Sequence, residues 1–352
     1  MPISRRKLLA ISIAAPLASS CAMRGSRASG ETVSSLAMKL GINATYVTVS
    51  AGKLAPAVAL SYSSQLRPAH ADSLFQAASL TKPVIAFVAL ALARQGKLNL
   101  DAPLSQYLPD GYQHRQNPRA NPPKFDLVKA NTLATIPVST LLNHSSGLPN
   151  WSSSTLNSEF DAGGRWQYSG EGYVLLHAII RAITGQDIDA FVDKYVFGPL
   201  EMRRSRMRLT EDMRDQLVQS TAWLPWTRPI EFVEPNAAAS LHTTATDYAK
   251  LMAHWVNDDA LLALTLAKPV PTDPSLGLSW GYGWGVEVAA GGPYLWQWGN
   301  NPGFRAFAMI SASSGNGFVL LTNSERGMPL ADLLARTVIL SEHGAFRFHM
   351  VG

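Results

Sequence analysis

A serine followed three residues later by a lysine is the first pattern in this chain that could do chemistry. The pattern occurs at Ser4/Lys7, Ser50/Lys53 and Ser79/Lys82. Only the third pair stands at the expected start of a helix, where side chains three positions apart are neighbours. A buried Lys82 would have a lowered pKa and could take the proton of the Ser79 hydroxyl. The alternative is a Ser N-cap followed by a surface Lys, and these residues alone leave both interpretations open.

A second serine motif is present, but its surroundings do not suit it. Residues 277–281, Gly-Leu-Ser-Trp-Gly, match the nucleophile elbow of α/β-hydrolases. That elbow needs a helix after the serine, whereas residues 282–286, Tyr-Gly-Trp-Gly-Val, are typical of a strand. We therefore reject Ser279 as the nucleophile.

Metal, cofactor and nucleic-acid chemistry have no support in the sequence. The eight histidines are scattered, none of them forms a His-x-x-x-His pair, and the chain has a single cysteine. Phosphate loops and dinucleotide fingerprints are absent from the sequence. The net charge of +5 owes three charges to Arg5, Arg6 and Lys7. We predict no metal, no cofactor and no nucleic-acid partner.

The N-terminal residues 1–21 are typical of an export signal. Paired arginines precede an apolar segment, as in twin-arginine signals, although an ordinary secretory signal is the alternative. Residues 17–21, Leu-Ala-Ser-Ser-Cys, are similar to a lipoprotein box that would end at Cys21. The sequence therefore predicts a protein of the bacterial periplasm or cell envelope, either lipid-anchored through Cys21 or cleaved nearby. Membrane contact is expected only through that anchor, because no later stretch approaches the roughly 20 apolar residues of a span.

The remaining chain predicts strands at both ends and helices between them. Strands are expected at 44–49, 57–62, 282–288, 307–310 and 318–322. Helices are expected at 79–95, 174–184, 188–196, 248–255 and 329–340, with a long polar loop at 111–135. This order favours an α+β fold, an antiparallel sheet flanked by helices with an inserted mainly helical domain. We expect one domain over 30–352, with the sheet part at about 40–96 and 265–352 and the helical insert at about 97–264.

Several segments, in order along nearly the whole mature chain, resemble one enzyme family. Residues 75–82, Phe-Gln-Ala-Ala-Ser-Leu-Thr-Lys, are similar to the nucleophile segment of class C β-lactamases and related penicillin-recognising serine hydrolases. That family includes D-Ala-D-Ala peptidases and family VIII carboxylesterases. Further similar segments are 96–109, 141–149 (Leu-Leu-Asn-His-Ser-Ser-Gly-Leu-Pro), 168–173, 199–202 and 297–304.

The resemblance implies the β-lactamase/transpeptidase-like fold and a role for individual residues. Ser79 would be the acylated nucleophile, and Lys82 and Tyr168 would move its proton to the leaving group. The backbone N–H groups of Ser79 and Asn300 would form the oxyanion hole. Gly170, Gln297, Trp298 and Gly299 fall where the family binds substrate.

Two of these positions depart from the family pattern. Gly170 replaces an Asn whose amide would bind the catalytic Lys and a substrate amide. Gln297 stands where a cationic or imidazole side chain often holds the substrate carboxylate. Both losses favour esters over carboxylate-bearing amides. Five tryptophans could line an apolar acyl pocket or simply pack in the core: Trp223, Trp226, Trp284, Trp296 and Trp298.

Three functions remain open at this point. The first is an exported serine hydrolase that acts on esters or related acyl compounds through a Ser79 acyl-enzyme. The second is a β-lactamase or D-Ala-D-Ala carboxypeptidase of the same fold. The third is a catalytically weak envelope protein that binds peptidoglycan. The expected partners are therefore a small-molecule acyl substrate or a peptidoglycan fragment.

Overall fold

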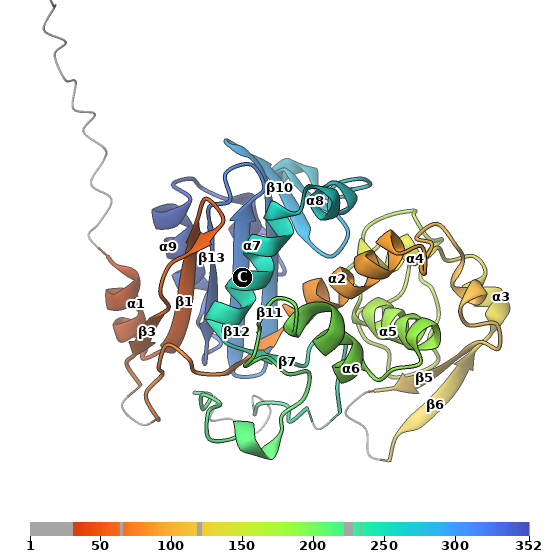
Figure 1. Cartoon of the computed structure of the whole chain (residues 1–352), viewed down its shortest axis with the longest axis horizontal. Helices are drawn as coiled ribbons and strands as arrows, with labels where there is room; N and C mark the ends of the chain where they lie inside the picture. The colour runs from red at the N-terminus through yellow and green to blue at the C-terminus, as the bar shows by residue number, and fades with distance from the viewer. Residues whose placement is uncertain (1–30, 64–65, 118–121, 222–227, 233, 352) are drawn as a thin grey trace, which may run out of the picture. The chain divides into compact units, whose positions relative to one another are not determined.

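Strands from both ends of the chain meet in one antiparallel sheet. The computed structural model describes residues 31–63, 66–117, 122–221, 228–232 and 234–351. The sheet has nine strands in the order β2-β1-β13-β12-β11-β10-β9-β8, with β3 paired to β1 beside that path (Figure 1). The strands are β1 Asn43–Ser50, β2 Lys53–Leu54, β3 Val58–Ser61, β8 Val270–Asp273, β9 Leu278–Trp280, β10 Gly285–Ala289, β11 Gly292–Asn301, β12 Phe304–Ser311 and β13 Gly317–Thr322. The predicted sheet built from both chain ends is confirmed.

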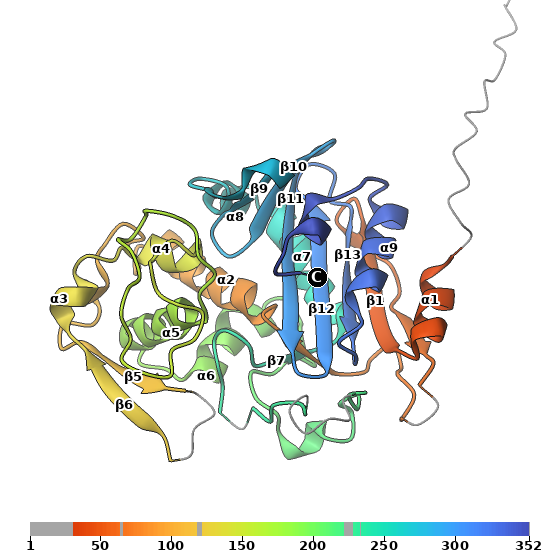
Figure 2. The same ribbon diagram turned by 180° about the vertical axis from the view of Figure 1, so that it is seen from behind.

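Helices cover both faces of this sheet because its central strands are apolar on both sides. Residues of β13 are buried throughout, as expected of a strand between two packed layers. On one face α7 (Ala245–Asn257) packs against β1 and β13. On the other face α9 (Met328–Val338) packs against β12 and β13, and α1 (Val33–Leu40) packs against α9 (Figure 2).

The remaining helices gather beside the sheet around α2. Helix α2 (Thr81–Arg94) is apolar on nearly every side, which is the pattern of a helix buried on all faces. It contacts α5 and α6, and α4 contacts α5 (Figure 1). The other helices of this group are α3 Ala130–Leu133, α4 Val138–Leu142, α5 Gly170–Thr184 and α6 Ile188–Val192. The short helix α8 spans Asp259–Thr265. Two further strands, β4 (Phe75–Ala78) and β7 (Leu241–Thr243), form a separate antiparallel pair.

The segment expected to be a polar loop contains regular structure. Residues 111–135 include the antiparallel strands β5 (Tyr112–Gln116) and β6 (Lys124–Val128), followed by α3. The prediction of a loop was wrong because the side chain that β5 buries is His114, a polar residue, rather than an apolar one. Its carboxylate partners, which compensate the burial, are Asp126 on the facing strand β6 and Glu171 in α5.

Thr32–Gly352 form one compact unit, so the division into a sheet part and a helical insert stays a prediction. Helix α7 lies within the range expected for the insert but packs on the sheet. The export signal and Cys21 lie outside the described residues. Within the described ranges, no helix is long and apolar enough to cross a membrane.

The rejection of the Gly-Leu-Ser-Trp-Gly elbow agrees with the structure. Ser279 lies inside β9, and the next element along the chain is the strand β10 rather than a helix. The Ser279 hydroxyl donates to the Val286 carbonyl at 3.4 Å, across the pair of strands. Ser279 is therefore part of the sheet's hydrogen bonding.

Candidate active site

A tight strand-to-helix turn presents Ser79. Strand β4 ends at Ala78, and α2 begins at Thr81. Ala78 has φ = +50°, an uncommon conformation for a residue with a side chain and one that concentrates at functional sites. The Thr81 hydroxyl donates to the Ala78 carbonyl at 2.6 Å and accepts from the Leu241 N–H at 2.9 Å. These bonds hold the turn against β7, so that the half-buried Ser79 has a defined position.

Lys82 lies in the first turn of α2 and is fully buried. Its Nζ lies 3.1 Å from Ser79 Oγ and 3.0 Å from the Ala238 carbonyl oxygen. Among the described residues, no carboxylate forms an ion pair with this amine. Burial therefore lowers the pKa of Lys82 to about 7, because desolvation disfavours the ammonium form. The structure rejects the alternative of a surface lysine.

Tyr168 stands two residues before α5 and completes the group around Ser79. Lys82 Nζ lies 4.6 Å from the centre of the Tyr168 ring. Burial raises the pKa of Tyr168, and hydrogen bonds with Ser79 and Gln297 only partly oppose that shift. The phenol therefore keeps its proton at neutral pH. The structure thus brings together the three side chains predicted for catalysis.

Gln297 contacts the tyrosine rather than solvent. Its Nε2 donates to the Tyr168 hydroxyl oxygen and to the Trp298 carbonyl, both at 3.0 Å, and its side chain is fully buried. Gln297 Oε1 has no hydrogen-bond partner among the described residues. The predicted contact of Gln297 with substrate stays a prediction, since the bonds in this structure place it behind the phenol.

The end of β11 has one edge without a strand partner among the described residues. Strand β11 pairs with β12 as far as Asn301, whereas its pairing with β10 ends at Trp296. Strand β4 packs against this part of β11. A Cβ added at Gly299 would lie 2.4 Å from the Ala77 carbonyl, so glycine is needed for the close approach. The approach brings Asn300, which is exposed, beside the turn that presents Ser79.

His144 is a residue of the site to which sequence reasoning gave no role. It is fully buried, has φ = +59°, and its ring centre lies 4.4 Å from that of Tyr168. Its Nδ1 accepts a hydrogen bond from the Ser169 N–H at 3.1 Å. Burial, and next the charge of Lys82, hold its pKa well below the ordinary value. His144 is thus a neutral ring behind Tyr168, and its place in the 141–149 motif was the signal that could have identified it.

The described tryptophans of the predicted acyl pocket pack in the core. Trp284 and Trp296 are fully buried, and Trp298 is nearly so. The Trp298 ring centre lies 4.7 Å from that of Tyr168 and 5.7 Å from that of Trp296. The other two members of that set, Trp223 and Trp226, lie outside the described residues.

Arg305 does not replace the missing cation at position 297. It pairs with Asn300 across the β11–β12 hairpin, whereas Gln297 pairs with Ala308. Positions 297 and 300 are three residues apart, and because strand side chains alternate they point to opposite faces of the sheet. The Arg305 guanidinium donates instead to the backbone carbonyls of Asn301 and Phe304.

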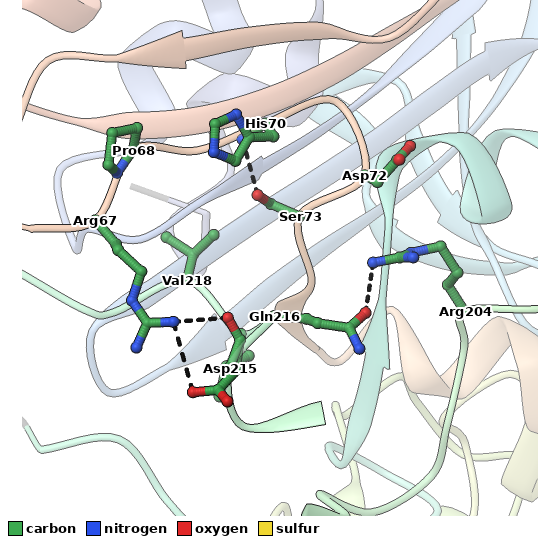
Figure 3. A pocket seen from close by; sticks show the side chains of 10 residues that line it. Arg67, Pro68, His70, Asp72, Ser73, Arg204, Asp215, Gln216 and Val218 are labelled. Carbon is green, nitrogen blue, oxygen red and sulfur yellow. Dashed lines mark hydrogen bonds and ion pairs between the residues drawn. The ribbon is translucent and has the colours of Figure 1, made fainter. Parts of the chain in front are cut away.

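A cavity of about 350 Å³ lies elsewhere on the molecule (Figure 3). Two of its charged groups are already partnered, since Arg67 contacts Asp215 and Arg204 donates to Gln216 at 2.6 Å. None of the predicted site residues lines it. No group of three or more His, Cys, Asp or Glu side chains that could hold a metal ion exists among the described residues.

The chain belongs to the beta-lactamase family, whose model matches residues 48–342. The esterase EstB of Burkholderia gladioli is 26% identical over 326 residues, which cover 73% of this chain and 79% of that protein. Penicillin-binding protein 4 of Amycolatopsis lactamdurans is 23% identical and covers 72% of each chain.

Solved structures show the same fold. A class C beta-lactamase aligns with a TM-score of 0.71 and 16% identity, covering 87% of this chain and 93% of its own. The octameric penicillin-binding protein homologue from Pyrococcus abyssi aligns with a TM-score of 0.70 and 19% identity, covering 88% and 76%. The protein is therefore a serine hydrolase with the β-lactamase/transpeptidase-like fold.

Proposed function

We propose that the enzyme hydrolyses esters through a Ser79 acyl-enzyme. The observation that carries this proposal is the 3.1 Å contact between Ser79 Oγ and a buried amine whose pKa is about 7. In its neutral form, Lys82 accepts the Ser79 proton while Oγ bonds to the ester carbonyl carbon. The backbone N–H groups of Ser79 and Asn300 stabilise the resulting oxyanion.

Tyr168 donates its proton to the departing alkoxide as the carbon–oxygen bond of the ester breaks. The Lys82 ammonium then returns a proton to the phenolate, so that both groups regain their starting forms. In the second half-reaction, water attacks the acyl-enzyme, gives its proton to the same pair, and releases the acid and Ser79. Because burial keeps the phenol protonated, Tyr168 serves as the donor and Lys82 as the base.

The neutral surroundings of Ser79, Lys82 and Tyr168 favour esters over carboxylate-bearing substrates. Gln297 supplies a neutral amide donor, and Arg305 lies on the opposite face of the sheet. A charge-assisted hydrogen bond contributes about 1.5–3 kcal/mol, against roughly 1 kcal/mol for a neutral one. Esters need no charged partner for a carboxylate, and they carry a better leaving group than amides. The similarity to an esterase supports the same choice.

Two covalent probes and two substrates test this proposal on the purified mature chain. We expect labelling by a fluorophosphonate, rapid hydrolysis of p-nitrophenyl butyrate, and slow hydrolysis of the cephalosporin nitrocefin. Labelling by both the fluorophosphonate and a fluorescent penicillin, with efficient nitrocefin hydrolysis, would instead favour a β-lactamase or D-Ala-D-Ala carboxypeptidase. Labelling by neither would favour the catalytically weak peptidoglycan-binding protein.

We propose further that the enzyme works in the bacterial periplasm or cell envelope. The support is the sequence of residues 1–21, with paired arginines, an apolar segment and Cys21 at its end. Mass spectrometry of the processed N-terminus tests the anchor. A diacylglyceryl Cys21 is the expected result, and a free N-terminus beyond residue 21 would mean a soluble exported enzyme.

A further inference from the structure

Gly170 is a glycine because a backbone carbonyl and an indole ring occupy the space of its side chain. A Cβ added at Gly170 would lie 2.8 Å and 2.9 Å from Cη2 and Cζ2 of Trp151, and 2.7 Å from the Asn150 carbonyl oxygen. Real Cβ atoms do not approach other atoms so closely. The sequence alone showed a lost side chain at this position, whereas the structure shows another residue in its place.

Hydrogen bonds on both sides of Trp151 fix it to the first turn of α5. The Asn150 carbonyl accepts from the N–H groups of Gly170 and Glu171 at 3.0 and 3.1 Å. On the other side, the Ser152 N–H donates to Glu171 Oε1 at 2.9 Å. Although its backbone is held in this way, the Trp151 side chain is 42% exposed. An exposed indole on a backbone held in this way is a surface that a ligand can contact at a low ordering cost.

The first turn of α5 faces Lys82 and Tyr168. Gly170 follows Tyr168 by two residues, and Tyr173 lies three residues further along, on the same side of the helix as Gly170. Lys82 Nζ lies 5.7 Å from the Tyr173 ring centre and 4.6 Å from that of Tyr168. The side of α5 that Trp151 covers is therefore the side turned toward Lys82.

We propose that Trp151 and Gly170 together form a specificity element that selects substrates with an extended apolar acyl group. The indole provides an apolar wall where a polar side chain at position 170 would otherwise meet the substrate. The proposal rests on the ester hydrolysis proposed above and names the substrate class of the same site. Aromatic rings bury large apolar areas at low entropic cost, so the wall favours longer acyl chains over acetyl.

A series of p-nitrophenyl esters tests the wall, because the leaving group is constant while the acyl chain grows from acetate to butyrate and hexanoate. We expect Trp151→Ala to lower kcat/KM for the hexanoate by about tenfold, chiefly through KM, and for the acetate by less than about twofold. The matched control is Phe125→Ala, which removes another exposed aromatic side chain from β6. An equal loss on all three esters would overturn the proposal.

A double-mutant cycle tests the coupling of the two residues. Gly170→Asn alone is expected to lower the melting temperature and the hydrolysis of every ester, because its side chain collides with the indole. Trp151→Ala combined with Gly170→Asn should recover part of the melting temperature and of acetate hydrolysis, because the Asn150 carbonyl still crowds the new side chain. The double variant should also increase nitrocefin hydrolysis several-fold over that of the unmodified enzyme. If the double variant were no more stable than Gly170→Asn alone, the side chains at positions 151 and 170 would not compete for the same space.

Binding measured without turnover separates this proposal from the reaction itself. In the Ser79→Ala variant, calorimetry with p-nitrophenyl hexanoate should show about tenfold weaker binding when Trp151 is also replaced by Ala. If the unmodified enzyme hydrolyses no ester while this binding difference persists, the proposed reaction fails and the apolar wall stands. If the esters are hydrolysed and no binding difference appears, the wall fails and the reaction stands.

Discussion

Two buried polar clusters flank the start of α5, and they differ in how their charges are balanced. In the first, His114 lies between two carboxylates, with Nδ1 2.7 Å from Asp126 Oδ1 and Nε2 3.4 Å from Glu171 Oε2. In the second, the buried Lys82 contacts only the neutral oxygens of Ser79 and the Ala238 carbonyl. One cluster thus places carboxylates against an imidazole ring, and the other leaves an amine without a carboxylate partner among the described residues.

The different partners produce different acid–base behaviour. Burial alone would raise the pKa of Asp126, but hydrogen bonds from His114, Gln116 and the Leu156 N–H outweigh it, so that this pKa is lowered. No comparable interaction supports the charge of Lys82, and burial brings its pKa to about 7. The comparison indicates that the paired cluster stabilises the β5–β6 hairpin, whereas the unpaired amine costs stability and gains basicity.

Replacement of the nucleophile should have the largest effect. We expect Ser79→Ala to reduce ester hydrolysis by about 10³-fold or more, because the groups of a catalytic unit fail together. Ser279→Ala is the matched control and should keep its activity. Hydrolysis of p-nitrophenyl butyrate measures both variants. If Ser79→Ala stays active while Ser279→Ala does not, the nucleophile is Ser279 of β9 rather than Ser79.

Removal of the Tyr168 hydroxyl should have the next largest effect. Tyr168→Phe keeps the ring that packs against His144 and Trp298 but removes the proton donor for the leaving group. We expect kcat to fall by about 10²–10⁴-fold. The melting temperature should hold, and fluorophosphonate labelling should stay detectable. Turnover close to that of the unmodified enzyme would exclude Tyr168 from the mechanism.

The lowered pKa of Lys82 predicts that activity and stability both rise with pH, but in different pH ranges. Because the neutral amine is the base, kcat/KM should fall about tenfold per pH unit below pH 7. In the unfolded chain the amine holds its proton up to about pH 10.5, so the cost of burying the charge is fully present below pH 7 and is relieved as pH rises from 7 to 10.5.

Lys82→Met should therefore be inactive and more stable than the unmodified enzyme. At pH 6 the gain should be on the order of a few kcal/mol, and it should shrink as pH rises toward 10.5. Urea denaturation of both proteins at several pH values measures the difference. A gain that does not change with pH would show that Lys82 is charged in the folded enzyme.

The paired cluster should respond to mutation in stability rather than in chemistry. His114→Gln leaves two carboxylates buried near each other and should lower the free energy of unfolding by about 3–5 kcal/mol. The control Lys268→Gln breaks the exposed pair with Asp101 and should leave the free energy of unfolding nearly unchanged. Urea denaturation at pH 7 measures both. If His114→Gln abolished turnover without loss of stability, the cluster around His114 would act in catalysis together with the one around Lys82.

A charge introduced behind Tyr168 should have the smallest effect. We expect Gln297→Lys to increase nitrocefin hydrolysis about tenfold relative to p-nitrophenyl butyrate hydrolysis, since a cation beside the phenol attracts the substrate carboxylate. Gln297→Met, a neutral side chain of similar size, should show no gain. Efficient nitrocefin hydrolysis by the unmodified enzyme would mean that another residue already supplies the charge.

The sequence alone was sufficient for the features that depend on local geometry. Ser79 lies in the turn that leads into α2 and Lys82 in the first turn of that helix, and their spacing of three residues makes the side chains neighbours wherever the helix is placed. The apolar strands at both chain ends and the helices between them likewise predicted the sheet and its flanking layers. The order of motifs, rather than any one of them, indicated Tyr168 and the 297–300 segment.

Only the tertiary structure decided the features that depend on packing between distant segments. The burial that lowers the pKa of Lys82, the bond from Gln297 to Tyr168, and the indole of Trp151 in the space beside Gly170 each join separate parts of the chain. The hairpin around His114 was missed because the contacts of this ring with Asp126 across the hairpin and with Glu171 of α5 exist only in the folded chain. Spacing along the chain fixes which side chains can meet locally, whereas desolvation and steric exclusion depend on what the rest of the fold brings against them.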